Sequence, residues 1–195
     1  MSKGIEDASD EDLIMLSDND EIPNLQQLDF KKIKNNYILF EQLFFYFKFN
    51  LLYDRMLWFG TKACRKKKLK SFSNLRNIKN KKYPFWRLDS FFTNDKKIDL
   101  KIIKKGGWHF TNLKNSDELF KKLSNFGHHD EFEISGLTVE KIKEKIKNKE
   151  MFYNHFADKE SENKWDFNYK LKRIDHKFLP EFLKVNSEKY KEWFD

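Results

Sequence analysis

The chain has 195 residues, in which 39 Lys and Arg outnumber 31 Asp and Glu to give a net charge of +8. This length supports a buried core, and an aromatic content of 17% excludes an intrinsically disordered chain. The single cysteine, Cys64, excludes a disulfide framework and a cysteine-based zinc site. No apolar run is long enough to span a membrane, and the acidic start lacks the pattern of a secretory signal. We therefore expect a cytoplasmic protein with no integral membrane segment, and we leave peripheral contact with a membrane open.

The positive charge is only a weak indication of a nucleic-acid partner. Lysine supplies 34 of the 39 basic residues and arginine supplies 5. Nucleic-acid-binding proteins more often use arginine, whose planar guanidinium contacts phosphate or guanine through two hydrogen bonds. An AT-rich genome gives the same bias toward lysine in any protein. We therefore expect no nucleic-acid partner.

The first half of the chain predicts an α/β fold. Leu13–Leu16 is a short apolar run between acidic residues, which is typical of a buried strand. Residues 25–35 are expected to form a helix, and the aromatic-rich residues 42–52 a core strand. Shorter strands or strand ends are expected at 58–61 and 107–112.

The second half predicts helices. Ser116 begins one, with two acidic residues in its first turn, where the helix dipole favours them. Thr138 begins another, in which apolar residues recur at helical spacing. Residues 179–194 form a terminal helical segment, with Pro180 tolerated in its first turn. We find no repeat and no linker, so we expect a single domain over residues 1–195.

Two carboxylates follow the first predicted strand. Asp18 and Asp20 lie in the block Ser17–Pro23, at the strand end where ligands bind in open α/β sheets. Carboxylates at this place suit Mg²⁺ or Mn²⁺, which take one or two of them together with water and phosphate oxygens. A polar turn explains the same residues. From the spacing alone we favour the turn.

Two further segments contain groups suited to binding or catalysis. In 106–110, paired glycines permit close approach of a ligand, Trp108 offers a flat face to a sugar, and His109 can exchange protons near neutral pH. The alternative is a turn followed by a core strand. In 128–131, two histidines stand beside two carboxylates, which suits metal binding, proton exchange or a plain surface cluster.

The remaining aromatic and basic runs have simpler explanations. Most of the aromatic residues before Trp58 are expected to lie in the core. The basic run 62–70 carries enough charge to neutralise a diphosphate, but we favour a solvated loop. No glycine-rich phosphate loop of either common type is present.

In order along the chain, these segments resemble family 17 of the glycosyltransferases, which includes the enzyme that adds the bisecting N-acetylglucosamine to N-glycans. The resemblance covers nearly the whole chain. Its most specific part is the pairing of the block 17–24 with Gly106–Phe110. It also includes the aromatic strand to Asn50, Trp58–Thr61, the stretch 122–131, Leu179, Pro180 and Asn186.

The resemblance implies a GT-A-like α/β fold with a mixed sheet flanked by helices, a nucleotide-sugar donor, a glycan acceptor and an inverting transfer. It implies Asp18 and Asp20 as ligands of Mn²⁺ or Mg²⁺ on the donor diphosphate, where the ion neutralises developing charge. The base that takes the acceptor proton would be Glu131, or Asp130 in a second alignment of the same motif. The other implied site residues are His109 in catalysis and Glu21, Trp58, Thr61, Trp108 and His129 in substrate binding.

The chain departs from the family in where its acidic motif lies. The strands that hold the nucleotide base precede this motif in the family, whereas here the motif begins at Asp18. We therefore expect a shortened fold that lacks the first nucleotide-binding strands, exposes a sheet edge at 13–16 and is completed by an amino-terminal segment or a second chain. The hypotheses are a glycosyltransferase, a catalytically inactive glycosyltransferase-like binding or assembly module, and a lysine-rich nucleic-acid binder.

Overall fold

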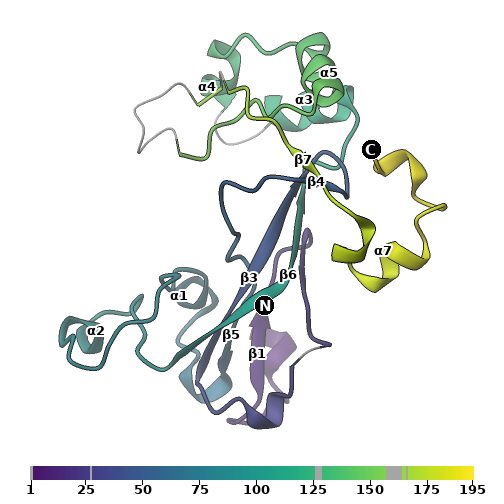
Figure 1. Cartoon of the computed structure of the whole chain (residues 1–195). Helices are drawn as coiled ribbons and strands as arrows, with labels where there is room; N and C mark the ends of the chain where they lie inside the picture. The colour runs from purple at the N-terminus through teal and green to yellow at the C-terminus, as the bar shows by residue number, and fades with distance from the viewer. Residues whose placement is uncertain (1, 27, 126–128, 157–163, 166) are drawn as a thin grey trace. The chain divides into compact units, whose positions relative to one another are not determined.

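The computed structural model describes the chain except for residues 1, 27, 126–128, 157–163 and 166. The chain divides into two compact units, of which the first comprises Met1–Leu43 and Leu57–His109 and the second Phe44–Met56 and Phe110–Asp195 (Figure 1). The fold is α/β, with strands flanked by helices, as predicted. The GT-A identity and the single domain remain predictions.

The first unit contains most of the strands. Two long strands, β3 (Tyr37–Tyr46) and β6 (Leu100–Thr111), begin in this unit and end in the second. The other elements of the first unit are η1 (Ser2–Ile5), β1 (Leu13–Leu16), β2 (Glu21–Pro23), η2 (Phe30–Lys32), β5 (Lys62–Arg65), η3 (Lys66–Lys68), α1 (Phe72–Arg76) and α2 (Asp89–Phe92).

The second unit is mainly helical. Its elements are β4 (Leu51–Leu52), α3 (Ser116–Ser124), α4 (His129–Ile134), α5 (Val139–Asn148), β7 (Lys172–Arg173), η4 (His176–Phe178), α7 (Glu181–Val185) and η5 (Lys191–Trp193). Among the described residues, none of the helices combines the length and the apolar character that crossing a bilayer requires.

The strand register of the first unit positions its polar residues. β1 is antiparallel to β5, and it ends the strand order, so the expected sheet edge at 13–16 is present. Leu16 lies opposite Lys62, which brings the residue after β1 beside the residue before β5. β2 is antiparallel to β6, with Glu21 opposite His109. Residues 17–21 therefore run from the edge strand to β6.

Alternation along β3 buries both faces of the sheet in the first unit. Ile38 and Phe40 pack with Ala63 in one cluster. Leu39, between them, packs on the other face with a cluster that includes Leu75. Because both faces are covered, β3 is a nearly continuous apolar run rather than an alternating one.

The local signals for strands and helices gave correct predictions at three places. Leu13–Leu16 is β1, and α3 and α5 begin where they were predicted. The side chain of Asn115 caps α3 by accepting a hydrogen bond from Glu118 N, and Thr138 caps α5 by accepting one from Lys141 N. These bonds satisfy amide groups that the helix itself leaves open.

Three other predictions were wrong or only partly correct. Among the described residues of 25–35, the short η2 is the only helix, since Ile33 is extended and buried against the sheet. Residues 42–52 hold two strands rather than one, because the chain turns at Phe47, whose φ is 66°. The terminal segment 179–194 is helical in part, in α7 and η5, and Pro180 lies at the N-cap of α7 rather than in its first turn.

The core of the first unit can be tested through its single cysteine. Cys64 is buried, and this burial raises the pKa of its thiol to about 11, so alkylation reports opening of the structure. Replacing the buried Phe40 by alanine should lower the free energy of unfolding by about 3–5 kcal/mol. We expect much faster alkylation of Cys64 in Phe40→Ala than in the wild type. Phe182→Ala, at an exposed position, is the control. If Cys64 were alkylated at the wild-type rate in both variants, the prediction would be contradicted.

Candidate functional site

The residues between β1 and β2 form a tight turn that closes on itself. Glu21 N donates to Asp18 O at 3.1 Å, and Asp18 N donates to Glu21 Oε2 at 3.0 Å. Ser17 Oγ donates to Glu21 O at 3.0 Å. The polar turn that the spacing favours is therefore present, and the carboxylate of Glu21 is part of it.

Glu21 also attaches this turn to the segment before β5. Its second oxygen, Oε1, accepts a hydrogen bond of 2.7 Å from Trp58 Nε1, and its side chain is buried. Gly60 makes this contact possible, because a Cβ at this position would lie 1.6 Å from Glu21 Oε1. Glu21 therefore positions other residues, and this role requires glycine at position 60.

A second buried connection lies beside the first. Thr61 and Gln42 are both fully buried. Thr61 Oγ1 lies 2.7 Å from Ser17 Oγ and accepts a hydrogen bond of 3.1 Å from Gln42 Nε2. The step between Gln42 and Thr61 joins polar atoms away from water, where an unpaired group is costly. Thr61, predicted to bind substrate, is thus part of the support of the turn.

His109 lies at the centre of the site. Its Nε2 is 3.3 Å from Asp20 Oδ2, and its ring stacks on Trp58 with centroids 4.4 Å apart and planes at 20°. The histidine side chain is buried, whereas that of Asp20 is 38% exposed. Neighbouring strand residues point to opposite faces, so Trp108 lies on the other face of β6 from His109. The structure brings Trp58 and His109 together, and it separates Trp108 from them.

Asp18 is held by an arginine that the sequence did not single out. Arg76, at the end of α1, donates from both terminal nitrogens to the two Asp18 oxygens, at 2.9 and 2.8 Å. These hydrogen bonds lower the pKa of the Asp18 carboxyl. Both side chains are about half exposed, so the pair adds little to stability. The 58 residues that separate them leave no local signal for this contact.

Lys62 connects α1 to the sheet. It belongs to β5 and is buried, so the prediction of a solvated loop over 62–70 was wrong at this residue. Its Nζ donates to the carbonyl oxygens of Arg76 and Ile78, at 2.7 and 2.6 Å. Burial lowers the pKa of Lys62 to about 8. Lys62 therefore fixes the end of α1, from which the Arg76 side chain reaches Asp18.

Asp18 and Asp20 alone provide too few ligands for a divalent cation, so a cation would bind here only together with a phosphate group and water. In the described part of the chain, His, Cys, Asp and Glu form no group of three that could hold a metal ion. Asp18 and Asp20 are close enough for the charge of Asp20 to raise the pKa of Asp18, against the larger effect of Arg76. Two carboxylates with the remaining positions filled by phosphate and water are a usual Mg²⁺ arrangement.

The first unit brings together most of the candidate residues. They are Asp18, Asp20, Glu21, Trp58, Thr61 and His109. His129, Asp130 and Glu131 form the start of α4, in the second unit, and His128 lies outside the described residues. Their assignment to substrate binding and to the catalytic base remains a prediction.

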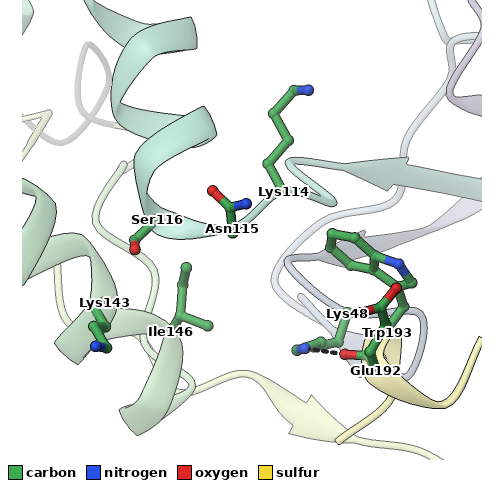
Figure 2. A pocket seen from close by; sticks show the side chains of 8 residues that line it. All are labelled: Lys48, Lys114, Asn115, Ser116, Lys143, Ile146, Glu192 and Trp193. Carbon is green, nitrogen blue, oxygen red and sulfur yellow. Dashed lines mark hydrogen bonds between the residues drawn. The ribbon is translucent and has the colours of Figure 1, made fainter.

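The second unit has a pocket of its own, with a volume of about 260 Å³ (Figure 2). The Lys48 ammonium donates to the carbonyl of Glu192 and lies 5.5 Å from the centre of the Trp193 ring. Three lysines and one glutamate make the lining cationic, which favours a small anion as ligand. None of the site residues predicted from the sequence lines it. The lining residues are Lys48, Lys114, Asn115, Ser116, Lys143, Ile146, Glu192 and Trp193.

Comparison with known proteins identifies no relative of this chain. Neither a family model, nor a curated protein, nor a solved structure matches this chain. The likeness to family 17 of the glycosyltransferases therefore depends on the motif residues alone.

The close contact at Gly60 predicts a selective effect of one methyl group. Gly60→Ala should displace the Glu21 carboxylate from the Trp58 indole and lower the free energy of unfolding by about 1–3 kcal/mol, the cost of breaking a buried hydrogen bond. Gly4→Ala is the matched control, because a Cβ there meets nothing within 4 Å. Chemical denaturation of both variants checks this. Equal stability of the two would show that the contact with Glu21 is unimportant.

The lowered pKa of Lys62 predicts a change of stability with pH. Because the folded chain gives up this proton near pH 8 and the unfolded chain only near pH 10.5, the unfolded state binds more protons between these values. The free energy of unfolding of the wild type should therefore rise from pH 8 to 10 relative to that of Lys62→Met. Lys147→Met, at an exposed position, should not show this difference. If the difference in free energy of unfolding between wild type and Lys62→Met stayed constant from pH 8 to 10, the prediction would be refuted.

Proposed function

We propose that the first unit carries a metal-assisted glycosyl-transfer site, which takes an N-acetylglucosamine-like sugar from a nucleotide-sugar donor to a glycan acceptor. One observation carries the proposal. Residues 17–21, 58–61 and 109 are far apart in the sequence, and hydrogen bonds and ring stacking bring them to one place. These segments are also among those on which the resemblance to family 17 depends. We place the activity in the cytoplasm, where a lone thiol such as Cys64 stays reduced.

Asp18 and Asp20 are the residues that would hold the cation, Mn²⁺ or Mg²⁺. The ion, when bound, neutralises negative charge on the leaving diphosphate. Arg76 contributes a second positive group, whose two parallel N–H donors suit a phosphate as well as a carboxylate. Because both partners of the Asp18–Arg76 pair are exposed, exchanging this contact for a phosphate and a cation costs little.

The buried residues of the site keep these groups in position. Glu21 fixes the turn that carries both aspartates, and Trp58 and His109 form a stacked floor beside Asp20. With its Nε2 at 3.3 Å from Asp20 Oδ2, His109 orients that carboxylate. The base for the acceptor hydroxyl, Glu131 or Asp130, is implied by the family resemblance alone, since both residues belong to the second unit.

A second candidate is a glycosyltransferase-like binding or assembly module without catalysis. The observation that favours it is that both aspartates already have partners within the protein, Arg76 for Asp18 and His109 for Asp20. This arrangement satisfies the carboxylates without a ligand. The two candidates differ in whether a bound donor turns over.

The test uses the full chain with a panel of nucleotide sugars, with and without Mn²⁺. We expect metal-dependent donor binding by calorimetry and slow donor hydrolysis, and we expect Asp20→Asn to reduce turnover by about a hundredfold. Asp117→Asn is the control, since it removes an exposed carboxylate from α3 in the second unit.

Three outcomes separate the candidates. Binding without turnover in the wild type supports the inactive module. No binding of any donor, or equal turnover in Asp20→Asn and wild type, contradicts the metal site. Glu131→Gln tests the base separately, because it should abolish transfer to an acceptor and leave donor hydrolysis in place.

A further inference from the structure

The segment that contains α2 exposes several large apolar side chains. Phe85 is 72% exposed, Trp86 71%, Leu88 70% and Phe92 88%. The rings of Phe85 and Trp86 touch edge to face, with centroids 5.2 Å apart. Large apolar side chains that are exposed within one short segment mark a surface that contacts another molecule or a membrane.

The base of this segment is fixed to the first unit. Lys79 N donates to Asp95 O at 2.7 Å, and Lys82 and Lys97 form a parallel bridge. Tyr83 is buried at the base. Within the first unit, the segment extends away from strands β3 and β5 and carries α2 at its outer end (Figure 1). Its apolar side chains are thus presented on an anchored loop rather than on a loose one.

The same segment is strongly cationic. Residues 79–97 hold six Lys and Arg against two Asp, a net charge of +4. Both aspartates are already paired, Asp89 with Arg87 and Lys96 and Asp95 with Lys79. Lys81 and Lys82 are exposed directly before the apolar residues. The segment therefore combines projecting aromatic groups with positive charge beside them.

We infer that residues 79–97 dock the chain on an anionic bilayer surface, with Phe85, Trp86, Leu88 and Phe92 entering the headgroup region. Aromatic side chains, tryptophan above all, are favoured at that depth, and neighbouring lysines are attracted to anionic headgroups. The charge comes mainly from lysine, which acts as a point charge and suits a fluid anionic surface better than a fixed bidentate partner. Side chains that are more than two thirds exposed also fit a yielding bilayer better than a flat protein surface.

The test is co-sedimentation of the full chain with vesicles of phosphatidylcholine alone and with 30% phosphatidylserine. We expect binding to the anionic vesicles that weakens as salt is raised, and little binding to the neutral ones. Phe85→Ser/Trp86→Ser should abolish it, and Lys81→Glu/Lys82→Glu should weaken it by about tenfold or more. The tryptophan emission of the wild type should shift to the blue on binding, and that of Trp86→Phe should shift less.

Matched controls come from the second unit. Phe178→Ser/Phe182→Ser removes two exposed phenylalanines there, and Lys121→Glu/Lys147→Glu makes the same change of charge. Binding that both controls retain supports the inference. No binding to anionic vesicles overturns it, as does equal loss in the controls. Self-association of the chain that Phe85→Ser/Trp86→Ser abolishes, without vesicle binding, would instead identify a protein contact and overturn the inference. Protection of Cys64 from alkylation verifies that each variant is folded.

Discussion

The arrangement of the candidate site depends on one buried carboxylate. Glu21 accepts hydrogen bonds from Asp18 N within its own turn and from the Trp58 indole in the segment before β5. A buried carboxylate is costly unless donors surround it, and these two N–H groups supply them. Because each oxygen takes its donor from a different part of the chain, the turn, the indole and the strand pair that carries Glu21 and His109 are fixed together. Gly60 leaves the space in which the carboxylate lies.

How well the sequence predicted an element follows from where its stabilising contacts lie. Leu13–Leu16 and the helix after Thr138 were predicted correctly because their signals are local: an apolar run, a capping side chain and a helical period. The prediction of a helix over residues 25–35 was wrong because Leu28, Phe30 and Ile33 pack into the apolar cluster on the sheet, where Ile33 is extended. The strand over 42–52 was interrupted by the left-handed turn at Phe47, and an aromatic run gives no signal for such a turn.

The candidate site shows the same division. The sequence identified Asp18, Asp20 and His109 through a motif, and the structure places them near one another. It did not identify Arg76 or the position of Lys62, because these depend on where α1 ends relative to β5. Lysines are so frequent in this chain that a buried one is indistinguishable from the rest by composition. Contacts between distant segments need the register of the sheet, which no local pattern encodes.

The site contains buried and exposed polar groups, and the free-energy cost of replacing their protein partners by a ligand differs between the two. Glu21, Thr61 and Gln42 are buried and hydrogen-bonded to one another or to the turn, so a ligand that took one of these partners would leave an unsatisfied group inside the protein. Asp18 and Arg76 form an exposed pair that water can replace on either side, at a cost of about 0–1 kcal/mol. A polyanion or a cation therefore binds with the smallest loss of existing contacts at Asp18, Arg76 and the neighbouring Asp20. The buried network then acts by keeping these exposed groups in place, which both the catalytic and the binding-only candidate require.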